Sequence, residues 1–139
     1  MKLLVAFIFT LFSFTAYAAD QTESVLNADC SRGAAFDSFQ CFSKKLSIQE
    51  KRMDEAVQHA LLNINSMWGK AANEELKAKL LQTQAHWKEY RDGQCTYRYY
   101  TKASAHPPSL SMEIAACKLD KTEERIKEIK NTFLVRKVE

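Results

Sequence analysis

Apolar residues recur at intervals of three and four along most of the chain, which is the period of an α-helix that buries one face. The first such row predicts a short N-terminal helix, and its members are Phe36, Phe39, Phe42 and Leu46. Ser47–Glu50 reads Ser-Ile-Gln-Glu, a capping box, so a second helix should begin there and end at Gly69. Residues 19–29 show no period, and we expect them to be frayed up to Cys30.

Two further helices are predicted in the second half of the chain. An asparagine and two glutamates at positions 73–75 form a start signal for a third helix, which continues toward Tyr100. Two prolines then interrupt the pattern and allow a fourth helix from about Pro108. No alternation of apolar and polar residues indicates a strand. The predicted fold is all-α, a small up-down helical bundle of three long helices plus a short N-terminal helix.

The predicted third helix has an unusual inward face. Residues four, three, four and four apart share that face, and they are Leu80, Gln84, Trp87, Arg91 and Cys95. A buried arginine must find hydrogen-bond partners, because an unpaired charge in a core is costly. We therefore expect Arg91 to lie in a satisfied polar network. The alternative is that its alkyl stem skirts the core edge and lets the guanidinium reach water.

Thr122 occupies the middle of the inward row predicted for the fourth helix. Its hydroxyl needs a partner, either the backbone carbonyl four residues earlier or Arg91 across the interface. Asp92 is expected to pair with Arg125 or with a neighbouring base. The residues predicted to form a network that defines the fold are Gln84, Trp87, Arg91, Asp92, Thr122 and Arg125.

The four cysteines predict two disulfides, because an even number in an exported chain is typical of paired thiols. Three pairings are open in principle. Cys95 and Cys117 lie at equal distances on either side of His106, where a helical hairpin would turn, so we favour Cys95–Cys117. That choice leaves Cys30–Cys41. One continuous helix from 30 to 41 would separate these two residues by roughly 16 Å, so Cys30 should lie off the helix.

The first 18 residues have the features of a secretory signal peptide. Lys2 precedes an almost wholly apolar stretch, and residues 16–18 read Ala-Tyr-Ala, a cleavage site. Residues 19–139 then form a single domain, expected in a periplasm or outside the cell. The apolar stretch is shorter than the roughly 20 residues of a membrane span, and no second one follows. We therefore expect no membrane insertion.

Charge and motifs exclude several functional classes. Loss of Lys2 with the signal leaves 19 of the 20 basic residues against 17 acidic ones, too near neutral for a nucleic-acid partner. His59, His86 and His106 lack the spacing of a zinc site, and the cysteines form no C-x2-C motif. No glycine-rich phosphate loop or G-x-S-x-G motif is present. The sequence predicts no enzyme, no metal and no cofactor.

One string of residues resembles a known family. The pattern is W-x-x-Y-R-D-x-x-C followed by C-x4-T-x2-R, carried by Leu81, Gln84, Trp87, Tyr90, Arg91, Asp92, Cys95, Cys117, Thr122 and Arg125. It is similar to the N-terminal domain of LprI-type lysozyme inhibitors, a bacterial exported module, and the resemblance covers essentially all of residues 19–139. It implies an all-helical periplasmic or secreted protein that, in some members, binds and inhibits lysozyme.

Two functions follow as hypotheses. The first is a lysozyme inhibitor that plugs the carboxylate-lined cleft of the enzyme and protects the cell wall. Its candidate partner-binding loop offers hydroxyls, an imidazole and an amine from Lys102, Ser104, His106 and Ser109. The alternative is a structural or interaction protein of the bacterial envelope without lysozyme activity. An exposed apolar patch beside Tyr97, Tyr99 and Tyr100 would favour it. Nothing in the sequence indicates the oligomeric state.

Overall fold

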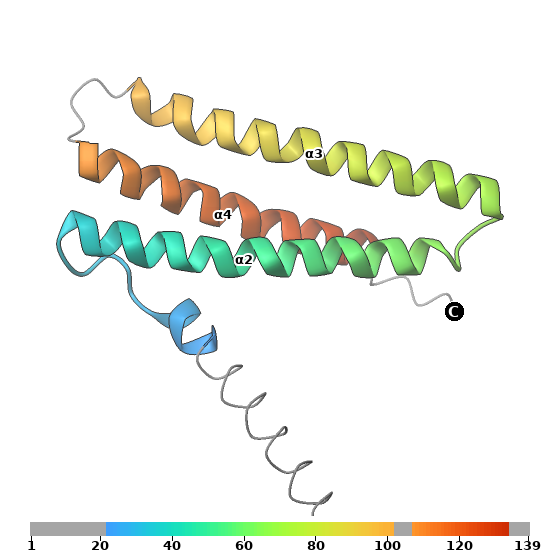
Figure 1. Cartoon of the computed structure of the whole chain (residues 1–139), viewed down its shortest axis with the longest axis horizontal. Helices are drawn as coiled ribbons and strands as arrows, with labels where there is room; N and C mark the ends of the chain where they lie inside the picture. Colours follow the sequence, from blue (N-terminus) through green and yellow to red (C-terminus); the bar gives the residue numbers. More distant parts are fainter. Residues whose placement is uncertain (1–21, 102–106, 134–139) are drawn as a thin grey trace, which may run out of the picture.

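The computed structural model describes residues 22–101 and 107–133, and these form three long helices. They are α2 (Ala35–Ile64), α3 (Lys70–Tyr100) and α4 (Pro107–Phe133), and residues 22–27 are also helical. In Figure 1, α2 and α4 run in the same direction and α3 runs back between their ends. No strand occurs within 22–101 or 107–133. The prediction of an all-α up-down bundle is confirmed.

The predicted boundary between the first and second helices is wrong. Ser47–Glu50 lies in the interior of α2, which continues unbroken from Ala35 to Ile64. A capping box needs an extended residue at its first position, but the preceding Lys44 and Lys45 favour a helix and nothing terminates it. The short helical segment lies instead at 22–27, where we expected a frayed chain end.

The connection between α2 and α3 also differs from the prediction. α2 ends at Ile64, and Gly69 precedes α3 in an extended conformation instead of ending α2. Asn73 lies one turn inside α3, where its side-chain oxygen accepts the Trp68 N–H at 3.1 Å. Its amide nitrogen donates to the carbonyls of Asn65 (3.2 Å) and Trp68 (2.9 Å). This buried amide therefore holds the turn from within the helix.

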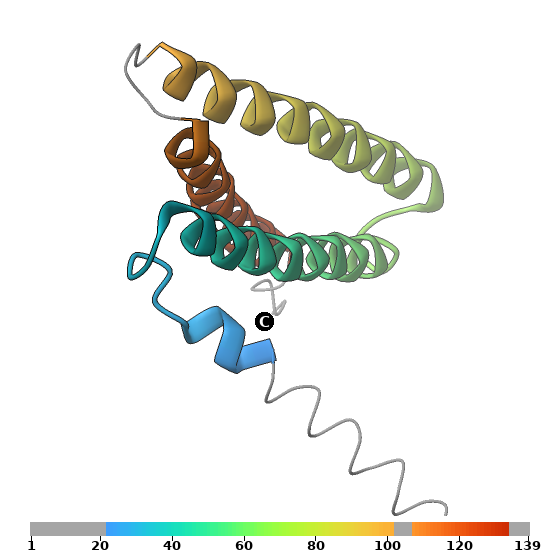
Figure 2. The same cartoon turned by 60° about the vertical axis from the view of Figure 1, so that its left-hand side comes forward.

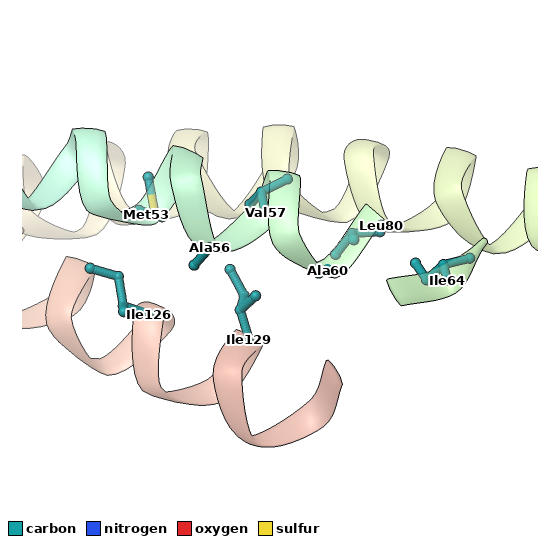
Figure 3. Packing of buried hydrophobic residues seen from close by; sticks show 8 residues of the cluster. All are labelled: Met53, Ala56, Val57, Ala60, Ile64, Leu80, Ile126 and Ile129. Carbon is teal, nitrogen blue, oxygen red and sulfur yellow. The ribbon is translucent and has the colours of Figure 1, made fainter. Parts of the chain in front are cut away.

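The hydrophobic core lies mainly between α2 and α4 (Figure 3). Its buried members are Met53, Ala56, Val57, Ala60, Ile64, Leu80, Ile126 and Ile129. Only Leu80 comes from α3, and α3 contacts α2 and α4 far less than those two contact each other. Figure 2 shows α3 standing to one side of the α2–α4 pair. Attachment of α3 must therefore depend on interactions other than apolar burial.

Both predicted disulfides are present. Cys95 and Cys117 join α3 to α4 with a Cα–Cα distance of 5.8 Å. Cys30 and Cys41 are paired at 5.5 Å, and Cys30 lies before α2 as expected. The chain folds back through Gly33, whose φ of +137° is a conformation that L residues rarely adopt. The first bridge thus links α3 to the bundle, and the second fixes the start of α2.

Two predictions fall wholly or mostly outside the described residues. The predicted signal peptide, 1–18, lies there, and so do Lys102, Ser104 and His106 of the candidate loop. Ser109, the fourth candidate, is not in a loop, because it lies in the first turn of α4. Among the helices that the structure describes, none is long and apolar enough to cross a lipid bilayer.

Candidate functional site

Arg91 of α3 is buried at the meeting point of the three long helices, with only 4% of its surface exposed. Its Nε donates to Asp92 Oδ1 at 2.8 Å on the same helix. Nη1 donates to Thr122 Oγ1 of α4 at 2.9 Å, and Nη2 pairs with Glu50 Oε1 of α2 at 2.8 Å. The guanidinium does not reach solvent along its stem, and it contacts all three helices.

Thr122 has both of the partners considered for it. The fully buried hydroxyl accepts the hydrogen bond from Arg91 and donates to the Lys118 carbonyl one turn earlier, at 2.7 Å. A hydroxyl can donate and accept at once, so the two interactions are compatible. Thr122 therefore links the Arg91 side chain to the backbone of α4 through two hydrogen bonds.

A second buried arginine, Arg125 of α4, ties α4 to α3. Its Nε donates to Gln84 Oε1 at 3.0 Å, and Nη1 pairs with Glu128 Oε2 at 2.7 Å. The guanidinium carbons of Arg91 and Arg125 lie 5.3 Å and 5.8 Å, respectively, from the centroid of the half-buried Trp87 ring. Both distances are in the range of a favourable cation–π interaction. The indole is thus a shared apolar surface for two buried cations.

Asp92 pairs with Arg91 and with Lys118, whose Nζ lies 3.2 Å from Oδ1, and not with Arg125. Partial burial favours the neutral acid, but the hydrogen bonds and positive charges of Arg91 and Lys118 outweigh it and lower the pKa of Asp92. Arg91 and Asp92 are adjacent on the helix and so point about 100° apart. The long Arg91 side chain nevertheless reaches the Asp92 carboxylate.

The sequence did not identify three members of this network, namely Glu50, Lys118 and Glu128. Glu128 is three residues after Arg125, a spacing at which helix side chains meet, so it could have been found. The Lys118 side chain pairs with Asp92 across the interface of α3 and α4, so no spacing within one helix could have identified it. Glu50 could not be found either, because its interpretation as part of a capping box gave its carboxylate another role. Three carboxylates face three bases, so the charges of the network are matched.

The opposite, outer face of α3 has a different character. Tyr90, Tyr97 and Tyr100 are 60%, 72% and 67% exposed, although tyrosine is an amphipathic residue that usually covers apolar surface. Arg98 points to the side of Arg91 but is exposed at this end of α3, and its guanidinium carbon lies 5.8 Å from the centroid of the half-buried Tyr99 ring. No carboxylate within 22–101 or 107–133 forms an ion pair with Arg98. This aromatic surface continues to the end of α3.

The described residues contain no cluster of histidine, cysteine and carboxylate side chains that could hold a metal ion. Ser109, the one described member of the candidate loop, is half-buried and has an interaction partner. The structure therefore places the six network residues together between the helices, and it places Ser109 at the hairpin end of the bundle, beyond the Cys95–Cys117 bridge.

Comparison with known proteins gives one match. A family model described as "Lysozyme inhibitor LprI" matches residues 26–129. This range contains α2, α3, most of α4, both disulfides and every residue of the network around Arg91. Neither the curated proteins nor the solved structures contain a match.

Proposed function

The chain belongs to the LprI family of lysozyme inhibitors, and we propose that it is an exported, non-enzymatic protein that binds lysozyme and thereby protects the cell wall. The observation that carries the proposal is the match over residues 26–129, which includes the whole buried network. Two disulfides in a domain of this size support an oxidising compartment such as a periplasm or the cell exterior. Cleavage after Ala18 of the predicted signal peptide is part of the proposal.

A rigid scaffold supports an inhibitory role. An inhibitor that enters an enzyme cleft gains affinity when its contact surface is already ordered before binding. The Cys95–Cys117 bridge and the Arg91 network hold α3 against α4 on the side of the bundle that leads to the connection between these two helices. The candidate loop residues Lys102, Ser104 and His106 lie on that connection, and Ser109 lies in the first turn of α4.

The proposal is tested by turbidity clearing of a bacterial wall suspension by a purified animal lysozyme. The mature chain with both disulfides formed should slow the clearing at micromolar concentration. The control is the same chain after reduction and alkylation, which should lose the effect because the scaffold is no longer held. Unchanged clearing with the oxidised chain would contradict the proposal.

The second candidate is a structural or interaction protein of the envelope without lysozyme activity. The exposed tyrosines at the end of α3 favour it, because an exposed aromatic patch often marks a protein contact. A pull-down from periplasmic extract separates the two functions. Recovery of one envelope protein by the wild-type chain and not by Tyr97→Ala, with no effect on lysozyme, would favour this candidate over inhibition.

A further inference from the structure

Four residues form a continuous stripe on the outer face of α3. They are spaced three, four and three apart, so they share one side of the helix, and they are Tyr90, Gly93, Tyr97 and Tyr100. Gly93 lies two residues after the buried Arg91, which turns it by about 200° around the helix, away from the network. We call these four residues the tyrosine stripe. In Figure 2, α3 lies at the edge of the bundle, so a face turned away from α2 and α4 is open to solvent.

The fold does not explain the glycine in this stripe. Gly93 has an ordinary helical φ, and a Cβ added to it would meet no atom within 4 Å. Glycine inside an exposed helix costs about 1 kcal/mol relative to alanine. A bare backbone position is useful where another molecule must approach the helix closely. Gly93 therefore marks a place where a partner can contact the backbone of α3 between two aromatic rings.

The tyrosines of the stripe are well suited to binding. Their rings are exposed, and their hydroxyls have no hydrogen-bond partner among the residues that the structure describes. Tyrosine and arginine are enriched among the residues that dominate the binding energy of protein interfaces. Tyrosine offers a large contact area with few rotatable bonds, and arginine offers several hydrogen-bond donors. The exposed Arg98 lies between Tyr97 and Tyr100 in the sequence and adds such donors.

Charge indicates the kind of surface that this region fits. The segment from Gly93 to Met112 contains no aspartate or glutamate, and it contains Arg98 and Lys102. Arg98 has no ion-pair partner among the described carboxylates, unlike Arg91 and Arg125. The exposed Glu89 lies four residues before Gly93 on the same side of α3, so the acid-free part of the stripe is the end of the helix with Tyr97 and Tyr100. This end complements a negatively charged surface. Glycoside hydrolases carry a pair of carboxyl groups in a concave cleft, and the end of a helix is convex.

We propose that the tyrosine stripe, with Arg98 exposed at the same end of α3 but on another side of the helix, is the surface that docks in the carboxylate-lined cleft of lysozyme. This inference rests on the proposed function and assigns it a contact surface. In the docked complex the backbone at Gly93 lies close to the wall of the cleft, the three rings cover positions where sugar rings bind, and the acid-free end of α3 lies nearest the carboxyl pair. The stripe, not the loop alone, then carries most of the affinity.

The test compares Gly93→Glu with Gln82→Glu in the full mature chain. Both variants add one carboxylate to the exposed outer face of α3, but Gln82 lies about 16 Å along the helix from Gly93. Inhibition of an animal lysozyme is measured from the turbidity clearing rate, and folding is checked by thermal unfolding. Gly93→Glu should weaken inhibition by about tenfold or more, as expected for a central contact. Gln82→Glu should inhibit like wild type.

A second comparison covers the aromatic rings. Tyr97→Ala should weaken inhibition, and Phe36→Ala should not, although Phe36 of α2 is 62% exposed and loses a similar ring. Binding should also weaken when the cleft is filled with an N-acetylglucosamine trimer, because the sugar and the stripe occupy the same site. Binding that is unaffected by the trimer would place the contact elsewhere on lysozyme and overturn the inference.

The outcomes separate this inference from the proposed function. If the wild-type chain inhibits and Gly93→Glu and Tyr97→Ala inhibit equally well, the proposed function stands and the stripe is not the contact surface. If the wild-type chain does not inhibit lysozyme at micromolar concentration, both are overturned. Loss of inhibition in both stripe variants, with unchanged unfolding temperatures relative to their controls, supports the stripe.

Discussion

The inner and outer faces of α3 both carry residues that are energetically unfavourable there, but the two faces differ in whether other residues compensate for them. On the inner face, Arg91 is buried, but three carboxylate or hydroxyl partners satisfy its donors. On the outer face, Gly93 weakens the helix and three tyrosines are exposed, and nothing in the described chain compensates. The residues of the inner face are therefore explained by their contacts within the fold. Nothing among the described residues explains the outer face, and for this reason we assign it to a partner.

Arg91 and Arg98 show the same contrast on a single helix. They are seven residues apart, two full turns, and so point in similar directions. Arg91 lies where α2 and α4 provide partners, whereas Arg98 lies beyond the Cys95–Cys117 bridge and is exposed. The position along the bundle, and not the residue type, decides which arginine is structural.

The largest expected effect comes from breaking the inner face. Arg91→Ala should lower the free energy of unfolding by about 2–4 kcal/mol, because the fully buried Thr122 hydroxyl loses its donor and Glu50 and Asp92 lose an ion-pair partner. Denaturant unfolding measures this change. Arg98→Ala, the matched control on the same helix, should change stability by less than about 0.5 kcal/mol. An unchanged unfolding midpoint in Arg91→Ala would show that the network does not hold the fold.

Removing the bridge between α3 and α4 should have a comparable but slightly smaller effect. Replacement of both Cys95 and Cys117 by alanine opens a loop of 22 residues and should destabilise the chain by about 3 kcal/mol in the chain-entropy model. α3 contributes only one residue to the buried core cluster. In the variant without the bridge, the backbone amide protons of α3 should therefore exchange with solvent faster than those of α2. Equal exchange in both helices would indicate that the bridge is dispensable for α3.

Gly93→Ala sharpens the comparison on the outer face. The added methyl group meets no atom of the chain, so the variant should be more stable than wild type by about 0.5–1 kcal/mol. It should also inhibit lysozyme less well, because the methyl group separates the partner from the backbone. Thermal unfolding and turbidity clearing measure the two effects. A variant that is both more stable and equally inhibitory would remove the reason to assign Gly93 to binding.

The smallest expected effect concerns acid. The pKa of Asp92 is lower in the folded chain than in the unfolded one, so its contribution to stability is present above the unfolded pKa of about 3.9 and is lost as pH falls through the folded pKa. Asp92→Asn should therefore lose less stability than wild type when the pH falls below about 4. If the unfolding midpoints of wild type and Asp92→Asn fall equally as the pH is lowered, the Asp92 carboxylate does not contribute to stability in this way.

Much of the fold could be predicted from the sequence because helical period and cysteine pairing are local signals. The buried face of α3 was visible in the spacing of Gln84, Arg91 and Cys95. The start of α2 was not, because a capping box within strong helix formers is indistinguishable in sequence from one that begins a helix. Asn73 was identified as a start signal, but its position one turn inside α3 depends on the turn that it holds.

The candidate site was predicted only in part. Glu128 follows Arg125 at helix spacing. The contacts of Arg91 with Glu50 and of Lys118 with Asp92 depend on how the helices pack, which no local pattern specifies. The sequence associated Tyr97, Tyr99 and Tyr100 with an exposed patch, yet it could not separate the half-buried Tyr99 from its exposed neighbours. The empty space that a Cβ added at Gly93 would meet is visible only in three dimensions.

The most direct test is oxidative footprinting of the mature chain with and without an animal lysozyme. The chain contains its own controls, because Phe36 and Trp68 are 62% and 64% exposed, similar to Tyr90 of the tyrosine stripe. We predict that lysozyme protects Tyr97 and Tyr100 from oxidation and leaves Phe36 and Trp68 unchanged. Protection of Phe36 or Trp68 with no change at the tyrosines would contradict the assignment of the outer face of α3 to binding.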